Sequence, residues 1–315
     1  MLLGIEIGGT KLQLAVGPGG GQPLTEIRRL QVDPTAGADG ILRHISREAG
    51  ELLANHPVHA VGIGFGGPVD VESGLTITSH QVPGWDRLPL VRWCRDHLEL
   101  PTALVNDSDA AGLAEARFGA GLGSPVVFYS NVGSGIGGAL VIDGELFRGG
   151  HGVASEIGHL RPGLAASGPT QTVESVASGW AIAAAARAAV EEQPDARDSV
   201  DLLTCCNGNP STLTTEHIAA AADAGNALAQ AVLHRACDTY GWALAQMITL
   251  IAPNSVVLGG GVSLAGGRLF LAPVRKAVDR YVFPPLREHF AIHLAALGEE
   301  VVLHGAMALA DELAS

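Results

Sequence analysis

One local pattern begins at Leu2 and again at Val126, and this repeat constrains the fold more than any other feature of the chain. Each copy has an apolar segment, a glycine-rich turn that carries a hydroxyl residue, and a second apolar segment. Short apolar segments on either side of a glycine turn are typical of β-hairpins. The pattern predicts strands over residues 2–7, 11–16, 126–132 and 137–142. We infer that the chain contains a duplicated domain.

The segments around these hairpins alternate between strand-like and helix-like patterns. After the first hairpin, strands are predicted at residues 25–31, 60–65 and 102–105, with helices at about 36–55 and 89–98. Such alternation is typical of an α/β domain. Further along, the periodicity predicts helices at about 173–191, 215–250 and 300–313 and a strand at 255–258. Residues 195–210, rich in proline, asparagine and charge, are predicted to form a loop.

The length and composition favour two globular domains. A chain of 315 residues, 47% hydrophobic and only 16% charged, can bury two cores and does not have the composition of a disordered protein. The repeat suggests where the domains lie. We expect a small domain of residues 1–118 and 301–315, and a large domain of residues 119–300.

The charge and the cysteines indicate the class of partner and the compartment. A net charge of −13 argues against nucleic acid or an anionic membrane as partner, because both attract a basic face, and favours a small molecule. The four cysteines lack paired metal spacing, and the adjacent Cys205 and Cys206 are poorly placed for a disulfide. The start of the chain lacks the features of a signal peptide. Residues 239–267 are uncharged, as a membrane span would be, but Pro253 and the glycines at 259–261 divide them into shorter segments. We therefore expect a cytoplasmic protein, with 239–267 as a buried helix and strand.

Three glycine-rich turns are candidates for phosphate binding. Glycine lets backbone N–H groups approach an anion that a side chain would keep away, and a neighbouring hydroxyl can donate one more hydrogen bond. Any one of the three alone is equally well explained as a tight turn. Two turns at equivalent places in a repeat predict a nucleotide bound between the halves, with the third turn near the adenosine. The candidate residues are Gly8, Gly9, Thr10 and Lys11 in the first turn, Gly133, Ser134 and Gly135 in the second, and Gly260 and Gly261 in the third.

Several motifs together resemble the ROK family of sugar kinases and repressors, within the actin-like ATPases. They are residues 4–11 (GIEIGGTK), 62–70 (GIGFGGPVD), 83–85 (PGW), 106–107 (ND), 133–138 (GSGIGG) and 156–159 (EIGH). The resemblance runs nearly end to end and implies an α/β fold of duplicated ribonuclease H-like domains that flank a cleft. Family repressors carry a helix-turn-helix domain before the first motif. That motif begins here at Gly4, which favours the kinase branch.

The resemblance also implies the reaction and the residues that perform it. The chain is expected to phosphorylate a hexose hydroxyl with ATP and Mg²⁺, as a homodimer or homotetramer. Asp107 corresponds to the general base, although it could instead be only the N-cap of a helix over about 110–118. Glu6, where the family usually has aspartate, would hold a magnesium-bound water. The implied sugar-binding residues are Gly67, Asn106, Asp107, Glu156, His159 and Glu174.

Two departures from the family leave the sugar open. Most members carry three cysteines between the positions of His159 and Glu174 that bind zinc with the histidine, whereas this chain has none there, so we expect no zinc site. If zinc were found, His80 and His151 would be the first ligands to test. Gln81 stands where the family commonly has asparagine. Glucose is the first candidate, with fructose, mannose or an N-acetylhexosamine as alternatives, and a non-catalytic sugar sensor as an alternative of another class.

Overall fold

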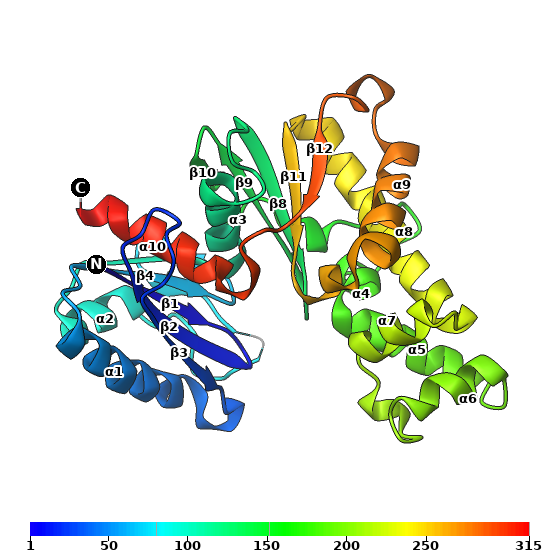
Figure 1. The fold of residues 1–315 in the computed structure, drawn as a ribbon, viewed down its shortest axis with the longest axis horizontal. Helices are drawn as coiled ribbons and strands as arrows, with labels where there is room; N and C mark the ends of the chain where they lie inside the picture. Colours follow the sequence, from blue (N-terminus) through cyan, green and yellow to red (C-terminus); the bar gives the residue numbers. More distant parts are fainter. Residues whose placement is uncertain (80, 151, 315) are drawn as a thin grey trace. The chain divides into compact units, whose positions relative to one another are not determined.

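The computed structural model describes residues 1–79, 81–150 and 152–314, and the chain divides into two compact units. The first unit comprises Met1–Tyr129, Ala139–Ala154 and Ala295–Ser315, and the second comprises Ser130–Gly138 and Ser155–Leu294. Both contain helices and β-strands, as expected (Figure 1). The predicted domain boundaries at residues 118 and 301 stay a prediction.

The first unit is built on a five-stranded sheet in the order β3-β2-β1-β4-β7. Its first three strands pair antiparallel, whereas β1, β4 and β7 run parallel. The C-terminal ends of parallel strands lie at one edge of a sheet. Residues 7–8, 65–66 and 106–107 are therefore neighbours. The strands are β1 (Leu2–Ile7), β2 (Lys11–Gly17), β3 (Glu26–Gln31), β4 (Ala60–Phe65) and β7 (Thr102–Asn106), and a separate small hairpin joins β5 (Val69–Asp70) to β6 (Leu75–Thr76).

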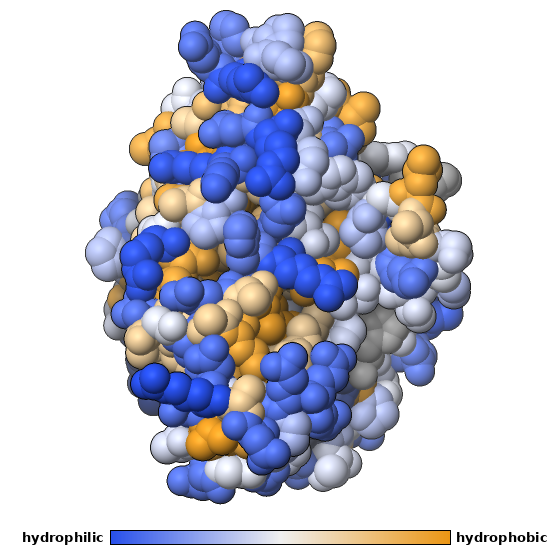
Figure 2. Space-filling view, turned by 90° about the vertical axis from the view of Figure 1, so that its right-hand side faces the viewer, coloured by the Kyte–Doolittle hydropathy of each residue, from blue (hydrophilic) through white to orange (hydrophobic). Residues whose placement is uncertain are grey.

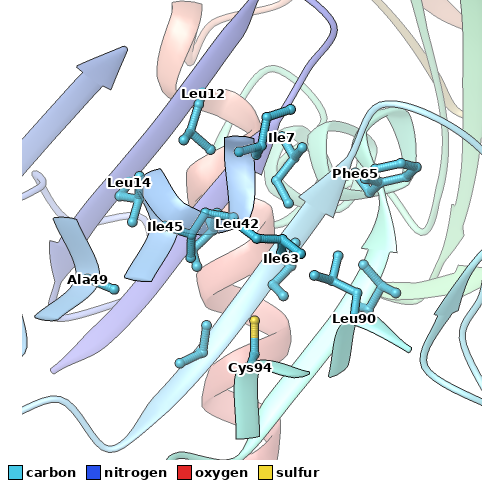
Figure 3. Close-up of a cluster of buried hydrophobic side chains, with 14 of the residues drawn as sticks. Ile7, Leu12, Leu14, Leu42, Ile45, Ala49, Ile63, Phe65, Leu90 and Cys94 are labelled. Carbon is cyan, nitrogen blue, oxygen red and sulfur yellow. The ribbon is translucent and has the colours of Figure 1, made fainter. Parts of the chain in front are cut away.

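Helices cover both faces of this sheet, because its strands present apolar side chains to both sides. Leu3, Ile5 and Ile7 of β1 belong to a core cluster with α1 (Gly37–Asn55) and α2 (Leu90–Leu98), part of which Figure 3 shows. Leu2 alternates to the opposite face and packs with Leu303 and Met307 of α10 (Val301–Ala314). Alternation between two buried faces is what a doubly covered sheet requires.

The C-terminal helix α10 approaches the sheet and α3 (Asp107–Phe118) at backbone distance. A Cβ atom on Gly62 of β4 would lie 1.8 Å from the carbonyl oxygen of Ala306, and one on Gly305 would lie 1.8 Å from that of Ala110. A real side chain at either glycine would force the helix away. These contacts fix α3, and therefore Asp107 at its start, against the sheet.

The second sheet repeats the strand order of the first. Its order is β10-β9-β8-β11-β12, again with a hairpin, a third strand beside it, and two strands added on the other side of β8. The predicted duplication is confirmed. These strands are β8 (Val126–Val132), β9 (Ile136–Ile142), β10 (Glu145–Phe147), β11 (Ser255–Gly259) and β12 (Ala291–Leu294).

Two helices predicted as continuous are each broken in the structure. The helix predicted over residues 173–191 divides at Ser178, whose extended backbone and side chain cap the second piece. The helix predicted over 215–250 divides at Gly225, which has a φ of +96°, and Asn226 caps the next piece. Both predictions were wrong because capping chemistry overrode an apolar periodicity that continues through the break. The pieces are α4 (Glu174–Ala177), α5 (Gly179–Glu192), α7 (Thr215–Asp223) and α8 (Ala227–Ile251).

The loop predicted over residues 195–210 is also wrong, because Arg197–Thr204 forms α6. Its polar composition concealed an amphipathic helix. Leu202 is buried in the second unit, while Arg197 and Asp201 form an exposed i,i+4 ion pair at 3.5 Å. The prediction also gave no element for α9 (Ala272–Tyr281) or for the short strands β5, β6, β10 and β12.

The uncharged residues 239–267 form a helix and a strand, as predicted. Helix α8 ends at Ile251, where Ala252 adopts a left-handed conformation before Pro253, and β11 follows. In the part of the chain that the structure describes, no helix is long and apolar enough to cross a membrane.

A buried carboxylate ties α3 to the segment that precedes α10. Glu115 is fully buried, and its Oε1 accepts hydrogen bonds from the backbone N–H groups of Ala296 and Leu297 at 2.8 and 2.9 Å. Its Oε2 accepts another from the N–H of Ala120 at 2.8 Å. One side chain therefore connects the end of α3 with the point at which the chain re-enters the first unit.

We expect Glu115→Ala to destabilise the first unit by about 3 kcal/mol, because three backbone N–H groups lose their acceptor. Urea unfolding followed by circular dichroism measures the change. Glu145→Gln is the matched control, because Glu145 is an exposed carboxylate of the same unit in a surface ion pair with Arg117. It should change stability by less than about 1 kcal/mol. Equal effects of the two substitutions would contradict the role of Glu115.

Candidate active site

Asp107 lies where β7 ends and α3 begins, at the edge of the first sheet. The N-cap of α3 is Asn106, whose Oδ1 accepts hydrogen bonds from the N–H groups of Ser108 and Asp109 at 2.8 and 3.4 Å. The alternative in which Asp107 is itself the cap therefore does not describe this helix. Asp107 is the first helical residue and its Oδ1 also accepts from the N–H of Ser108, at 2.8 Å.

Asn106 also fixes the neighbouring turn. Its Nδ2 donates to the carbonyl oxygen of Gly67 at 3.0 Å and, more weakly, to that of Phe65 at 3.4 Å. The amide thus holds both the start of α3 and the turn that follows β4. The prediction that Asn106 and Gly67 bind sugar stays a prediction, and the structure gives Asn106 a positioning role in addition.

The first predicted phosphate turn lies at the same edge as Asp107. The N–H of Gly8 donates to the carbonyl oxygen of Lys11 at 2.9 Å and closes the turn. Between the turn and Asp107 lies Gly66, whose N–H donates to Ile7 at 2.8 Å and whose Cβ, if present, would lie 3.5 Å from Asp107 Oδ2. The sequence analysis did not assign Gly66 a role. Its place directly after a parallel strand was the signal that could have identified it.

Gln81 lies over the first turn. A Cβ on Gly9 would meet the Gln81 side-chain oxygen at 1.5 Å, so only glycine leaves room for this amide. Thr10 is exposed at the tip of the turn. Gln81 was singled out from the sequence only as a departure from the family, and the structure shows the residue that it contacts. His80 lies outside the described residues.

Glu6 is held in a network at the base of the same turn. Lys11 Nζ lies 3.3 Å from Glu6 Oε1, and Gln13 Nε2 donates to Glu6 Oε2 at 2.6 Å. Gln13 is fully buried, and its own oxygen accepts from Arg29 Nε at 2.8 Å. Sequence reasoning missed Gln13 and Arg29, although the strand pairing places Gln13 opposite Glu6. The network fixes a carboxylate, the kind of oxygen ligand that Mg²⁺ prefers, beside the turn.

In the second unit, Glu174 supports the second phosphate turn. Its Oε2 accepts a hydrogen bond from the N–H of Ile136 at 2.7 Å, and a Cβ on Gly135 would lie 2.7 Å from the same oxygen. The carbonyl oxygen of Gly133 accepts from the N–H of Gly179 at 2.8 Å, which anchors the turn to the start of α5. Ser134 is exposed at the tip. The turn is thus held from two sides while its tip stays accessible.

The third glycine turn contacts the second. Gly260 has a φ of +83°, and a Cβ there would lie 2.5 Å from the carbonyl oxygen of Val132, the last residue of β8. Gly261 begins a short 3₁₀ helix, and Ser263 Oγ donates to the oxygen of Gly260 at 2.7 Å. The structure therefore brings these two turns side by side within the second unit, as a shared nucleotide would require.

His159 and Glu174 lie close enough to Glu156 to influence its ionisation. A Cβ on Gly158, between the first two, would lie 2.3 Å from the carbonyl oxygen of Ile136, so this short 3₁₀ segment lies against the second turn. Burial of its carboxyl group raises the pKa of Glu156, although the residue as a whole is exposed. His159 opposes this shift, and the carboxylate of Glu174 adds to it. The three predicted sugar-binding residues of this unit therefore form one group.

An arginine holds the loop between His159 and Glu174. Arg161 Nη1 donates to the carbonyl oxygens of Gly168 and Pro169 at 2.8 and 2.7 Å, with Gln171 at 3.2 Å. Sequence reasoning missed this residue, because nothing in a lone arginine indicates which carbonyl groups a folded loop will present. The N–H of Val173 donates to Leu160 and closes the loop at 2.8 Å.

The described residues contain no group of three or more histidines, cysteines or acidic residues that could hold a metal ion. All four cysteines are free, and only Cys205 is exposed. Burial raises the pKa of Cys94 and Cys237 to about 12, so neither thiol readily becomes a thiolate ligand. The expectation of no zinc site stays a prediction, since His151 lies outside the described residues.

The chain matches the model of the ROK family over residues 2–313. A glucokinase of Streptomyces coelicolor is 30% identical over 320 residues, which cover 99% of this chain and 98% of its own. An N-acetylmannosamine kinase of Escherichia coli is 30% identical over 311 residues, which cover 96% and 98%. The crystal structure of a ROK family glucokinase from Streptomyces griseus in complex with glucose and AMPPNP superposes with a TM-score of 0.85 at 32% identity, over 99% of each chain.

We expect Glu156→Gln to raise the melting temperature at about pH 7.5 and to have no effect at about pH 4. A raised pKa means that the folded state binds this proton more tightly than the unfolded state does, so ionisation of Glu156 lowers stability as the pH rises. Below the ordinary pKa, both states are protonated and the difference disappears. Thermal unfolding of the variant and the wild type at the two pH values measures the difference in melting temperature. A melting temperature that falls more at the higher pH would contradict the shift.

Proposed function

The chain belongs to the ROK family, and we propose that it transfers the terminal phosphate of ATP to a hydroxyl of a hexose, with glucose as the first candidate. One observation carries the proposal: a carboxylate, Asp107, lies at the same sheet edge as a glycine-rich turn, with only Gly66 between them. Phosphoryl transfer needs a base for the hydroxyl proton close to groups that bind phosphate. The glucokinases among the relatives support the same reaction.

In this reaction Asp107 accepts the proton of the attacking hydroxyl. The hydroxyl oxygen then forms a bond to the terminal phosphorus, and ADP leaves with the electrons of the broken P–O bond. The N–H groups of the two turns stabilise the phosphate oxygens. Both turns depend on glycine, since a Cβ on Gly9 or Gly135 would collide with a side-chain oxygen already in place.

The sugar hydroxyls would be bound by Glu156, His159 and Glu174, together with Asn106, Gly67 and Asp107. Carboxylates and amides suit vicinal hydroxyls because they form hydrogen bonds in pairs. Glu174 already accepts one bond from Ile136, and a carboxylate offers about four acceptor positions. It can therefore support the turn and bind a hydroxyl together. We place the third turn, Gly260 and Gly261, near the adenosine.

Mg²⁺ would be held through a water by Glu6. When bound, Mg²⁺ supplies positive charge to the β- and γ-phosphate oxygens. Lys11, paired with Glu6, presents a second cation at the same turn. The fixed position of the Glu6 carboxylate between Lys11 and Gln13 supports this role, as does its chemistry.

An N-acetylhexosamine is the second candidate substrate, favoured by the N-acetylmannosamine kinase among the relatives. Fructose and mannose remain in the set to be tested. The three intact turns and Asp107 argue against a sugar sensor without catalysis.

We also expect a cytoplasmic enzyme and a homo-oligomer. The latter is supported by exposed apolar side chains of the second unit, Trp180, Leu250, Leu264 and Phe283. The face shown in Figure 2 presents an apolar area surrounded by hydrophilic side chains.

A coupled assay of ADP formation against glucose, fructose, mannose and N-acetylmannosamine tests the function and names the substrate. We expect sugar-dependent turnover with ATP and Mg²⁺, and the highest kcat/KM for one of these sugars. Sugar binding in calorimetry without any turnover would instead identify a sensor.

We expect Asp107→Asn to lower kcat by about 10²- to 10⁴-fold while sugar binding and melting temperature stay nearly unchanged, because the amide keeps the shape but cannot accept the proton. Asp109→Asn is the matched control: it removes the same charge from the same first turn of α3 and should leave kcat within a few-fold of the wild-type value. Near-normal turnover of Asp107→Asn would exclude Asp107 as the base.

We expect the purified enzyme to contain no stoichiometric zinc and to keep its activity in a zinc-selective chelator at excess Mg²⁺. Arg161 organises the loop after His159 through carbonyl hydrogen bonds that need no metal. Elemental analysis and chelation assays measure this. About one zinc per chain, lost together with activity, would contradict it and direct attention to His80 and His151.

A further inference from the structure

A cavity of about 330 Å³ lies within the first unit, away from the proposed active site. It is bounded by α2, the first residues of the edge strand β7, the β5–β6 hairpin, Arg148 and the last turns of α10. Thr102 in its wall and Asn106, the residue before Asp107, stand four residues apart along β7, which is about 13 Å in an extended strand. Its apolar wall is formed by Val71, Val91, Leu104, Leu309 and Leu313.

The cavity contains two arginines, Arg95 and Arg148, that form no ion pair with any residue that the structure describes. Of its two acidic residues, Glu312 is already paired with Arg117 at 2.7 Å. Among the residues that the structure describes, no carboxylate lies within ion-pair distance of Arg95 or Arg148. Arg95 Nη2 donates a long hydrogen bond, 3.4 Å, to the carbonyl oxygen of Thr102. In a protein of net charge −13, an unneutralised pair of guanidinium groups around one cavity is unusual.

Arg148 also has a buried donor without an acceptor. Its Nε is inaccessible to solvent and makes no hydrogen bond with any described residue. Buried donors in folded proteins are almost always paired, and an unpaired one frequently marks the place of a bound ion, water or ligand. The guanidinium group is a planar donor that matches the oxygens of carboxylates and phosphates.

We propose that this cavity binds a small phosphate ester, with the phosphate group held by Arg148 and Arg95. Two guanidinium groups suit a dianionic phosphate, and Arg binds it through parallel N–H donors. The volume lies at the lower limit of ligand pockets, which fits a molecule of the size of a monosaccharide phosphate rather than a nucleotide. Glu72 and Ser73 offer oxygens to hydroxyl groups of the ester, and the apolar wall covers its carbon skeleton.

Helix α10 lines the cavity and also packs against α3, the helix that begins at Asp107 of the proposed active site. Leu309, Glu312 and Leu313 line the cavity, while Gly305 of the same helix lies against α3, which begins at Asp107. A ligand in the cavity would therefore touch the helix that holds α3 against the sheet. The binding proposal itself does not depend on the proposed kinase activity.

Calorimetry on the full chain tests the proposal, with glucose 6-phosphate as the probe and with glucose and AMPPNP at saturation to fill the predicted active site. We expect a further binding event that Arg148→Gln or Arg95→Gln weakens about ten- to a hundredfold, the range for a lost hydrogen bond to a charged group. Arg92→Gln is the matched control, because Arg92 lies on the same helix as Arg95 with its side chain 82% exposed and outside the cavity. It should bind the probe as the wild type does.

A measurement on the unchanged protein keeps the test valid if a variant folds poorly. The Nε–Hε signal of Arg148 in ¹⁵N NMR should shift on titration with glucose 6-phosphate, and inorganic phosphate should cause a smaller shift. Absence of binding, binding that Arg148→Gln leaves unchanged, or a response to citrate but to no phosphate ester would each overturn the proposal.

Discussion

The structure depends on the close contact of α10 with the first sheet and with α3. At Gly62 and Gly305 no side chain separates the two segments, so that backbone meets backbone. The contact closes a long excursion, because the chain forms Ser155–Leu294 of the second unit before its final return to the first at Ala295. Burial of Leu303 and Met307 against Leu2 stabilises this return. The position of α3, and hence of Asp107, follows from where α10 packs.

The candidate site is shaped by what surrounds the glycine turns as much as by the turns. In each unit a polar side chain from a distant segment lies on the turn: Gln81 on Gly9, and Glu174 on Gly135. Such contacts restrict the turn to one conformation, which would reduce the ordering that binding of the proposed phosphate requires. They also explain why glycine is needed at these two positions, since any side chain would collide with the protein's own side chain. Preorganised donors of this kind are the principal means by which a site stabilises transferring phosphate.

The sequence predicted those parts of the fold that depend on local patterns. The two hairpins, the repeat and the position of Asp107 after a strand came from glycine turns and strand periodicity, which act over a few residues. Other features depend on contacts that no local pattern contains. Glu115 binds the N–H groups of Ala296 and Leu297, 181 and 182 residues further along the chain. The polar helix α6 was missed because a single buried leucine, Leu202, packs it against the second unit. The breaks at Ser178 and Gly225 were missed because local capping interrupts an apolar pattern that continues through them. For the site, the family motif indicated the residues, but not that Asn106 and Glu174 also hold backbone groups.

If Glu156, His159 and Glu174 bind the sugar as proposed, the loop after His159 influences which sugar is chosen. Arg161 holds the carbonyl groups of Gly168 and Pro169, so the loop is organised by a side chain that the loop itself supplies. A guanidinium group reaches carbonyl oxygens from one side and in a plane, whereas a tetrahedral metal draws its ligands around a point. Because Glu156, His159 and Glu174 lie at the two ends of this loop, its shape sets the spacing of the proposed hydroxyl ligands. Kinases of two different sugars are both about 30% identical in sequence to this chain. Sequence identity at this level therefore supports phosphoryl transfer to a sugar, but it does not distinguish between the two sugars.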